Sequence, residues 1–366
     1  MYFTGLSLIN FRNYRSLDLA LPKGPVVIHG ANAQGKSNFL EAAYLVSIAK
    51  SYNVHQEREL IHHNALISGE PAVITAEAEA SSGHIQTRMV LQAKDRGVEK
   101  QIRVNGLPCL ASELVGQVNA VLFTASDLDL VYGAPSSRRR FLDILISQVD
   151  RAYLRTLQRY QRVLSQRNHL LRMVKDISSK EEELAFWDME LIKEGTVITD
   201  KRHAVISDLS RLASELYQEL APDYNLNISY IPSVGLSESY EERLDEVRGK
   251  EIALGVTLVG PHRDDLGVVV NDVDMGTYAS RGEARTIALA LRLAEASFLR
   301  NERGEEPVLL LDDILSELDS YRRKLVVEKL CLQEQALLTT TDLSLLDSGA
   351  LEQMTRFQVS GGIIST

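Results

Sequence analysis

Residues 29–38 constrain the fold of this chain more than any other stretch, because they read His-Gly-Ala-Asn-Ala-Gln-Gly-Lys-Ser-Asn. This stretch contains the pattern G-x-x-x-x-G-K-[ST] of a phosphate-binding loop, which has meaning only between a strand and a helix. Residues 26–28 before it are strand-like, and residues 37–49 after it have a helical pattern. The alternative is a glycine turn that happens to precede Lys and Ser. The residues that match are Gly30, Gly35, Lys36 and Ser37.

The loop predicts a site for the phosphates of a nucleotide. Glycines let backbone N–H groups turn toward an anion, and the N-terminus of the following helix adds about half a positive charge. Lys36 is expected to reach the β- and γ-phosphates and to assist catalysis, and Ser37 to ligate Mg²⁺. We include the neighbouring Asn32 and Asn38 among the nucleotide-binding residues.

Length and charge set broad limits on the rest of the chain. With 366 residues and a net charge of −10, we expect about two domains and no general affinity for nucleic acid. No apolar run is long enough for a membrane span, and residues 1–11 lack the basic start of a secretory signal, so a cytoplasmic protein is expected. Residues 138–175 differ from the average, since they hold ten Arg or Lys against two Asp.

The N-terminal third has the alternation of β-strands. Residues 3–10 and 16–21 are expected to form two strands in the same sheet as the phosphate loop. Arg12 and Arg15 in the turn between them are candidates to contact a nucleotide or DNA, and solvated turn arginines are an equal alternative. Further strands of an antiparallel segment are predicted at residues 72–80, 84–92 and 101–104, and residues 120–123 are expected to close that region as one more apolar strand.

A helical pattern runs from residue 138 to residue 221. Ser178 and Ser179 suggest a break, which favours two long antiparallel helices. Four arginines recur at i, i+4, i+8 and i+11 and therefore share one helix face. Such a face is either solvated or in contact with DNA phosphates. The candidate DNA-binding residues are Arg138, Arg139, Arg140, Arg151, Arg155, Arg159 and Arg162.

The segment that follows is predicted to change from loop to strand. Residues 223–250 are polar and read as a loop. Strands are expected around residues 268–270 and 275–278, after the hexapeptide Gly-Pro-His-Arg-Asp-Asp at residues 260–265.

Two carboxylates end the apolar run at residues 307–313. A buried strand that carries an acid at its C-terminal end is where a phosphate-loop fold holds Mg²⁺. Asp312 is the predicted metal ligand, and Asp313 is predicted to orient or deprotonate the attacking water. The alternative is that both aspartates cap the next helix.

A second anion site is predicted at Ser280-Arg281-Gly282-Glu283, before a helix at residues 284–299. Two phosphate sites in one chain suggest that two copies face each other. Each nucleotide would then lie between the phosphate loop of one copy and Ser280 and Gly282 of the other. The turn with Ser316 and Asp319 is expected to help position water. An ordinary N-cap at Ser280 is the alternative.

These segments together resemble the RecF family, which has the ABC-type ATPase head of SMC and Rad50 proteins. The resemblance implies an ATP-dependent DNA-binding protein that uses ATP and Mg²⁺, forms a homodimer on ATP and acts in recombinational gap repair. It implies work on duplex or gapped DNA with RecR and RecO as partners, and help in loading recombinase at single-strand gaps. The segments that carry it are residues 10–14, 30–37, 121–123, 138–143, 260–265, 280–283 and 309–319.

The chain departs from that pattern at two places. The family signature Ser-Gln-Gly-Gln reads Ser-Arg-Gly-Glu here, which puts the Glu283 carboxylate near the expected γ-phosphate of a neighbouring copy. Residues 339–342 read Thr-Thr-Thr-Asp where transporter-type ATPases have a switch histidine.

The predicted fold is therefore α/β, an ABC-type P-loop ATPase head with an inserted, mainly helical lobe and no long coiled coil. Residues 1–124 and 302–366 would form lobe I, and residues 125–301 lobe II. A weak, DNA-stimulated ATPase with slow turnover is expected. A DNA-scaffolding dimer without useful hydrolysis and a transporter ATPase subunit are the alternatives.

Overall fold

The computed structural model describes residues 1–54, 56–235 and 239–365, which divide into two compact units. Unit 1 comprises Met1–Asp127 and Ala288–Thr366, and unit 2 comprises Leu128–Ile287. The second boundary differs from the predicted one at 301/302. The reason is that helix α9 (Arg281–Arg303) continues across it, and the apolar side chains of its later turns are buried in unit 1.

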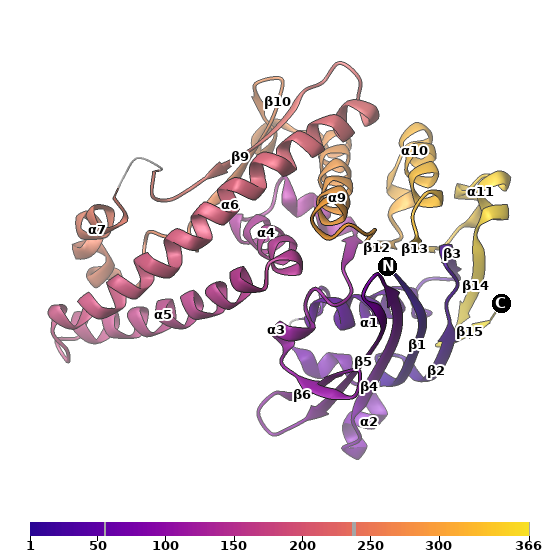
Figure 1. Cartoon of the computed structure of the whole chain (residues 1–366), viewed down its shortest axis with the longest axis horizontal. Helices are drawn as coiled ribbons and strands as arrows, with labels where there is room; N and C mark the ends of the chain where they lie inside the picture. Colours follow the sequence, from indigo (N-terminus) through magenta and orange to yellow (C-terminus); the bar gives the residue numbers. More distant parts are fainter. Residues whose placement is uncertain (55, 236–238, 366) are drawn as a thin grey trace. The chain divides into compact units, whose positions relative to one another are not determined.

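Unit 1 contains two six-stranded sheets, whose strands are visible in Figure 1. Sheet A is antiparallel, in the order β2 (Tyr14–Ala20), β1 (Tyr2–Phe11), β4 (Ala72–Ala80), β5 (Gly83–Ala93), β6 (Val98–Val104) and β7 (Leu107–Cys109). Sheet B has the order β15 (Ile363–Ser365), β14 (Thr355–Ser360), β3 (Gly24–His29), β13 (Gln335–Thr340), β12 (Val308–Asp312) and β8 (Ala120–Phe123). Sheet B is parallel except for β15.

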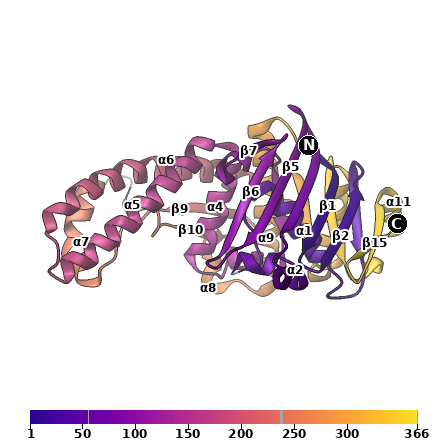
Figure 2. The same ribbon diagram turned by 90° about the horizontal axis from the view of Figure 1, so that it is seen from below.

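The phosphate loop connects β3 to α1 (Lys36–Ile48), and α1 contacts strands of both sheets. Figure 2 shows strands of sheet A in front of α1. Because sheets flank the helix on two sides, even Glu41 in its middle is fully buried. The prediction that the first two strands share a sheet with the phosphate loop is wrong. Both sides of β1 are hydrogen-bonded, to β2 and to β4, so β3 has no edge of β1 to pair with.

The remaining helices of unit 1 are short, apart from α9. The α-helices are α2 (His63–Ser68), α3 (Ala111–Leu114), α10 (Ser320–Cys331) and α11 (Ser348–Gln353). The 3₁₀ segments are η1 (Glu57–Leu60), η4 (Ile314–Glu317) and η5 (Leu343–Leu345), and η2 (Ala125–Leu130) runs across the boundary into unit 2.

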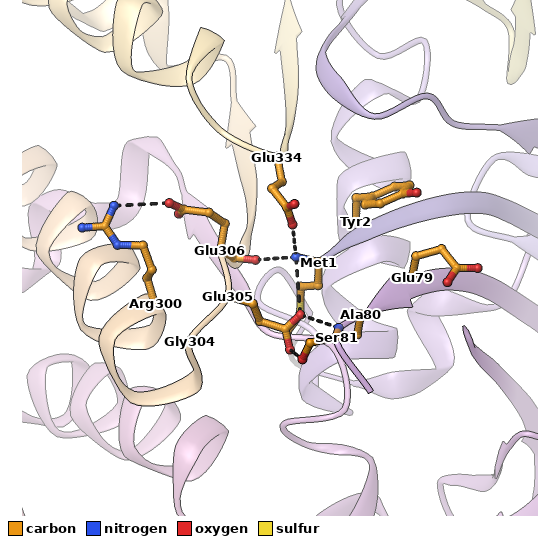
Figure 3. A pocket seen from close by; sticks show the side chains of 10 residues that line it. All are labelled: Met1, Tyr2, Glu79, Ala80, Ser81, Arg300, Gly304, Glu305, Glu306 and Glu334. Atoms are coloured by element: carbon orange, nitrogen blue, oxygen red, sulfur yellow. Dashed lines mark hydrogen bonds and ion pairs between the residues drawn. The ribbon is translucent and has the colours of Figure 1, made fainter. Parts of the chain in front are cut away.

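The start of β1 is tied to sheet B by charge. The amino group of Met1 donates a hydrogen bond to the carbonyl of Glu306 (2.9 Å) and forms an ion pair with Glu334. These groups border a hollow of about 490 Å³ that is shown in Figure 3. Glu305 accepts hydrogen bonds from the backbone and hydroxyl of Ser81 at 2.9 and 3.0 Å in the same hollow. The carboxylates of this hollow therefore bind segments that are distant in sequence.

Unit 2 is mainly helical, as predicted. Helices α5 (Arg151–Lys175) and α6 (Leu184–Leu220) pack along each other, and residues 176–180 interrupt the helical pattern close to the predicted break. The other elements are α4 (Pro135–Val149), η3 (Glu181–Glu183), α7 (Tyr240–Leu254) and α8 (Met275–Tyr278), with a small sheet of β9 (Leu226–Ile231), β10 (Asp265–Val270) and β11 (Val273–Asp274).

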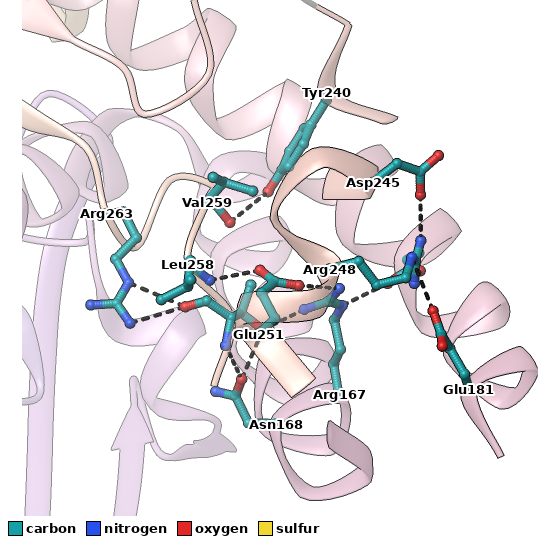
Figure 4. A network of polar contacts seen from close by, with 12 residues as sticks. Arg167, Asn168, Glu181, Tyr240, Asp245, Arg248, Glu251, Leu258, Val259 and Arg263 are labelled. Carbon is teal, nitrogen blue, oxygen red and sulfur yellow. Dashed lines mark hydrogen bonds and ion pairs between the residues drawn. The ribbon is translucent and has the colours of Figure 1, made fainter. Parts of the chain in front are cut away.

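Strand β9 and helix α7 both correct the prediction that residues 223–250 form a loop. Residues 236–238 within that range lie outside the described part. The polar sequence did not indicate a helix, because ion pairs of its charged side chains join α7 to other helices (Figure 4). Fully buried Arg167 binds Glu251 of α7 at 2.7 Å and Asp188 of α6 at 2.6 Å, and Arg248 of α7 binds Asp188 at 2.8 Å. Removing one member of such a buried set leaves an unpaired charge, which is strongly destabilising.

Residues 275–278 form helix α8 and not the predicted strand. The cause is local, since the Asp274 carboxylate accepts hydrogen bonds from the Gly276 N–H (3.0 Å) and the Thr277 hydroxyl (2.7 Å). Such a side-chain cap stabilises the first turn of a helix at the point where the apolar alternation would otherwise favour a strand.

Candidate nucleotide-binding site

The phosphate loop depends on its two glycines. Gly30 has φ +154°, and a Cβ there would lie 2.4 Å from the carbonyl oxygen of Val359 on β14. Gly35 has φ +118°, and a Cβ there would lie 2.6 Å from the side-chain nitrogen of Asn13. Only glycine fits these close approaches, so the backbone N–H groups can line a cradle for an anion.

Lys36 is held in the loop that it follows. Its Nζ donates hydrogen bonds to the carbonyls of Gly30 (2.8 Å) and Ala31 (2.9 Å), and the side chain is 7% exposed. Burial lowers the pKa of Lys36, and the charges of Asp313 and Asp312 oppose that shift. The ammonium group thus lies over the loop with two carboxylates near it, as expected of a phosphate-binding lysine.

The loop is braced by residues that the sequence did not single out for this role. Asn13 donates to the carbonyl of Gln34 (2.9 Å) and accepts from the side chain of Asn38 (2.7 Å). The Tyr14 hydroxyl donates to the carbonyl of Gly35 (2.9 Å), and burial raises the pKa of Tyr14 above its usual value. Asn38 therefore acts in the structure through Asn13. The sequence did contain a signal for this role, because residues 13 and 14 are the last two residues of the segment 10–14 that resembles the family.

Arg12 forms an internal ion pair. Its Nε and Nη2 lie 2.6 and 3.0 Å from the two carboxylate oxygens of Glu41, and a third nitrogen donates to the carbonyl of Glu59. Glu41 also accepts from the hydroxyl of Ser51 at 2.5 Å. In the structure, Arg12 therefore neutralises the buried carboxylate of Glu41. Asn32, by contrast, is exposed in the loop.

Asp312 meets the phosphate loop at the end of β12. Its Oδ1 accepts from the Ser37 hydroxyl (2.8 Å) and from the Thr339 hydroxyl (2.9 Å), and its Oδ2 accepts from Tyr52 (3.2 Å). Parallel pairing of β12 with β13 places Asp312 beside Thr339. A hydroxyl and a carboxylate at hydrogen-bond distance form a donor set suited to Mg²⁺, which favours oxygen ligands. The sequence missed Thr339 and Tyr52 as partners of this acid.

Asp313 has a different environment from its neighbour. Its backbone is left-handed (φ +52°), and its N–H donates to the Thr339 hydroxyl at 3.0 Å. Among the described residues, its buried Oδ1 has no hydrogen-bond partner. Burial raises the pKa of Asp313, and the charge of Lys36 opposes that shift. A strained backbone and an unsatisfied carboxylate oxygen beside a phosphate loop indicate a functional group.

The turn after Asp313 uses its polar groups locally. The Ser316 hydroxyl donates to the Asp313 carbonyl (2.8 Å), and the Asp319 carboxylate accepts from the N–H of Arg322 (2.9 Å) as the N-cap of α10. Both residues are exposed.

Ser280 and Glu283 form a reciprocal cap at the start of α9. The Glu283 carboxylate accepts from the Ser280 N–H (2.8 Å), and the Ser280 hydroxyl accepts from the Glu283 N–H (3.3 Å). These hydrogen bonds lower the pKa of Glu283. A Cβ at Gly282 would meet nothing within 4 Å among the described residues. The glycine is therefore not required by the packing of the described chain.

The basic residues of unit 2 separate into two groups. Arg138 forms a bidentate pair with Asp265 (2.6 and 2.8 Å), Arg139 donates to the Asp264 carbonyl (2.8 Å), and Arg159 pairs with Glu194 (2.9 Å). In the exposed group, Arg140 lies on α4. Of the candidates on α5, Arg151, Arg155 and Arg162 are exposed, and their side chains make no ion pair or hydrogen bond with the described residues.

The hexapeptide at residues 260–265 forms a buried polar centre of unit 2. His262 bonds the Tyr160 hydroxyl (2.7 Å) and the Thr257 carbonyl (3.1 Å), and burial lowers its pKa to about 4. The carbonyl of Pro261 accepts from buried Arg202 (2.7 Å). A Cβ at Gly260, which has φ +121°, would lie 2.1 Å from the Tyr240 hydroxyl. The motif thus positions helices through hydrogen bonds, a role that its spacing did not reveal.

Other metal sites find no support in the described residues. Residues 1–54, 56–235 and 239–365 contain no group of three or more His, Cys, Asp or Glu placed to hold a metal ion. The acidic hollow of Figure 3 has its carboxylates engaged by Met1, Ser81 and Arg300. In the same ranges, no helix has the length and apolarity required of a membrane span.

The fold and the site define a class of protein, a phosphate-loop nucleotide-binding head. Comparisons with known proteins agree. Residues 2–363 match the model of the RecF/RecN/SMC N terminal domain. The DNA replication and repair protein RecF of Herpetosiphon aurantiacus is 41% identical over 384 aligned positions, which cover 100% of this chain and 99% of that protein. RecF of Halalkalibacterium halodurans is 38% identical, with 99% and 98% covered.

Solved structures extend the comparison. A structure titled as the recombination mediator protein RecF-ATP in the RecFOR pathway has a TM-score of 0.89 at 32% identity, with 100% of this chain and 97% of the other covered. The Smc head domain of Pyrococcus furiosus, with a TM-score of 0.56 at 18% identity, shares the fold. The chain belongs to the RecF family of DNA replication and repair proteins. This confirms the predicted family and the predicted ABC-type head.

Proposed function

We propose that this protein is an ATP-dependent DNA-binding protein of recombinational gap repair, which dimerises on ATP and helps to load recombinase at single-strand gaps. One observation carries the proposal: the Ser37 hydroxyl and the Asp312 carboxylate lie 2.8 Å apart beside the phosphate loop, next to the unsatisfied oxygen of Asp313. The similarity to RecF proteins, one of them titled with ATP and the RecFOR pathway, supports it.

The residues present fit ATP and Mg²⁺. ATP supplies a cleavable phosphoanhydride, and Mg²⁺ neutralises charge on its phosphates. Gly30 and Gly35 keep the cradle open, Lys36 would bind the phosphates, and Ser37 and Asp312 would hold the metal ion. Asp313 is the proposed acceptor of the proton of the attacking water, because its raised pKa and unsatisfied oxygen suit a general base.

Dimerisation is proposed to use Ser280 and Gly282 of a second copy. Gly282 has no packing reason within the described residues, and glycine in a helix costs about 1 kcal/mol relative to alanine. A close approach by another molecule explains its presence. The reciprocal cap holds the Glu283 carboxylate in hydrogen bonds with Ser280. Ser316 and Asp319 are proposed to complete the same interface.

DNA is proposed to contact three exposed arginines of α5, Arg151, Arg155 and Arg162. Arg138, Arg139 and Arg159 would support this surface from their ion pairs and hydrogen bonds, and exposed Arg140 would extend it. The proposed protein partners are RecR and RecO, and work on chromosomal DNA is proposed to take place in the cytoplasm. ATP hydrolysis, weak and DNA-stimulated, would reset the dimer.

Sedimentation with and without a slowly hydrolysed ATP analogue tests the proposal. We expect the mass to double with the analogue and Mg²⁺ and to stay unchanged for the variant Lys36→Ala. Added duplex DNA should bind the dimer more tightly than the monomer, with a strong dependence on salt. A chain that stays monomeric with the analogue, and binds DNA equally with and without it, would contradict the proposal.

A further inference from the structure

Gln34 of the phosphate loop is hydrogen-bonded by two segments that lie far from it in the sequence. The Gly361 N–H donates to the side-chain oxygen of Gln34 at 2.7 Å, and the Gly362 N–H donates to its backbone carbonyl at 3.2 Å. The side chain of Asn13 donates to the same carbonyl at 2.9 Å. Gly361 and Gly362 lie in the turn between β14 and β15, which extend sheet B beyond β3 in Figure 1. We call Asn13, Gln34, Gly361 and Gly362 the loop clamp.

The loop clamp is closely packed at Gly362. This residue has φ +76°, and a Cβ there would lie 2.7 Å from the backbone oxygen of Asn13. Gly106, in the turn between β6 and β7, has nearly the same φ, +80°, but a Cβ there would meet nothing within 4 Å among the described residues. Both turns use the left-handed backbone that glycine allows. Only Gly362 is also needed because two segments meet there, so the two glycines form a matched pair for experiment.

The loop clamp fixes the direction of one peptide unit of the phosphate loop. In a trans peptide, the carbonyl of one residue and the N–H of the next point in opposite directions. Because two donors hold the Gln34 carbonyl on the side of Asn13 and Gly362, the Gly35 N–H points away from them. That N–H has no hydrogen-bond partner among the described residues. It is therefore available to an anion in the cradle.

Other carbonyls of the phosphate loop are engaged in the same manner. The side-chain nitrogen of Gln34 donates to the carbonyl of Asn32 at 3.3 Å, so this side chain links the turn at Gly361 to a second peptide unit of the loop. The carbonyl of Gly35 accepts from the Tyr14 hydroxyl at 2.9 Å. With its carbonyls bonded to the protein, the loop presents its N–H groups to phosphate oxygens.

We propose that the loop clamp positions the N–H groups of the phosphate loop for a polyphosphate anion, with Gln34 and Gly362 as the positioning residues. The inference rests on the proposed function and adds to it a dependence of nucleotide affinity on the turn between β14 and β15. Asp312 and Asp313 are held by other groups, among them Thr339. Weakening the loop clamp therefore lowers the affinity for the nucleotide and leaves the hydrolysis step itself unchanged.

The test is titration calorimetry of the full chain with two probes, which are a slowly hydrolysed ATP analogue with Mg²⁺ and pyrophosphate. Gly362→Ala should weaken the binding of both probes roughly tenfold, which corresponds to about 1.4 kcal/mol, the net contribution of about one hydrogen bond. The matched control is Gly106→Ala, which should bind both probes as the wild type does. Both alanine variants should melt at a lower temperature than the wild type, because alanine is strained at a positive φ.

Gln34→Met is a second variant that keeps every glycine in place. Methionine has a side chain of similar length but cannot accept from Gly361 or donate to Asn32, so the binding of both probes should weaken. In steady-state ATP hydrolysis, KM should rise in Gln34→Met and in Gly362→Ala while kcat stays the same. The two substitutions together should weaken binding by less than the product of the single effects, because both act through one clamp.

Wild-type affinity in both Gly362→Ala and Gln34→Met would overturn the inference. So would an equal loss of affinity in Gly106→Ala, or a fall in kcat without a rise in KM. A wild type that binds pyrophosphate but not the ATP analogue would refute the proposed function, and the pyrophosphate affinities of the variants would still decide the inference. A wild type that binds neither probe would overturn both.

Discussion

Thr339 links the two carboxylates of the site, and its replacement by valine tests how far their positions depend on it. The fully buried hydroxyl donates to Asp312 at 2.9 Å and accepts from the backbone N–H of Asp313 at 3.0 Å. Valine has nearly the same shape but neither hydrogen bond. Asp312 keeps its hydrogen bonds with Ser37 and Tyr52, whereas the N–H of Asp313 loses its partner.

The expected effect follows from those two bonds. A buried donor left without a partner costs about 1–3 kcal/mol. We expect Thr339→Val to cost the folded state about this much. Because Asp313 is then no longer held in place, we expect the barrier to ATP hydrolysis to rise by a similar amount, about 2 kcal/mol. Since 1.36 kcal/mol corresponds to a factor of ten in rate, kcat should fall roughly 30-fold. KM should change little, because within the described ranges the hydrogen bonds of the Thr339 side chain go to residues 311–313 and not to the phosphate loop or Lys36.

The assay is steady-state ATP hydrolysis together with thermal unfolding. Thr339→Ser keeps the hydroxyl and should recover most of the rate. The matched control is Thr340→Val, since Thr340 is equally buried and its hydroxyl bonds the backbone of Asp342 at 3.1 and 3.2 Å without touching either carboxylate. Both valine variants should lose similar stability. An equal fall of kcat in the two would refute a positioning role for Thr339.

Three further predictions follow from the site and from unit 2. Asp313→Asn should keep the ATP-driven dimer but lower the rate of hydrolysis by at least about 100-fold, whereas Lys36→Ala should lose both the dimer and hydrolysis. Sedimentation measures the dimer, and an ATPase assay measures hydrolysis. An Asp313→Asn variant that forms the dimer and hydrolyses ATP at the normal rate would exclude Asp313 as the base. Gly30→Ala should abolish nucleotide binding, measured by titration calorimetry, because its Cβ would lie 2.4 Å from the carbonyl of Val359; normal affinity would contradict the close approach. Because the pKa of His262 falls from 6.5 to about 4 on burial, the folded state favours the neutral ring. Its contribution is complete above pH 6.5 and is lost as the pH falls toward 4, by roughly 3 kcal/mol. His262→Gln should flatten the melting temperature over that range, and an unchanged acid slope would count against it.

The sequence alone determined the class of the fold and the centre of the site. The phosphate-loop pattern between a strand and a helix, and an apolar strand ending in Asp312 and Asp313, are local signals, because each depends on residues within about ten positions. Two long helices in unit 2 were also predictable from their leucine spacing. The structure contains these elements, the strand and helix that flank the loop, the strand that ends at Asp312 and the two long helices, since propensity and burial agree in them.

The tertiary structure decided what depends on partners distant in sequence. Tyr52 and Thr339 reach Asp312 from segments that no local pattern connects with β12. The later part of the predicted loop at residues 223–250 belongs to α7, which continues to Leu254, because Glu251 and Arg248 of this helix pair with Arg167 and Asp188 on other helices. The hydrogen bond between Gln34 and Gly361 joins residues 327 positions apart, and it arises because β14 pairs with β3 next to the phosphate loop.

The physical reason is the range of the interactions. Caps, turns and amphipathic periods involve groups a few residues apart, so composition and spacing reveal them. The pairing of charges and hydroxyls in the interior is set by which strands and helices become neighbours. The arrangement of strands and helices in a folded protein leaves few buried polar groups without a hydrogen bond. Asp313 is a position where a carboxylate oxygen is left without one among the described residues.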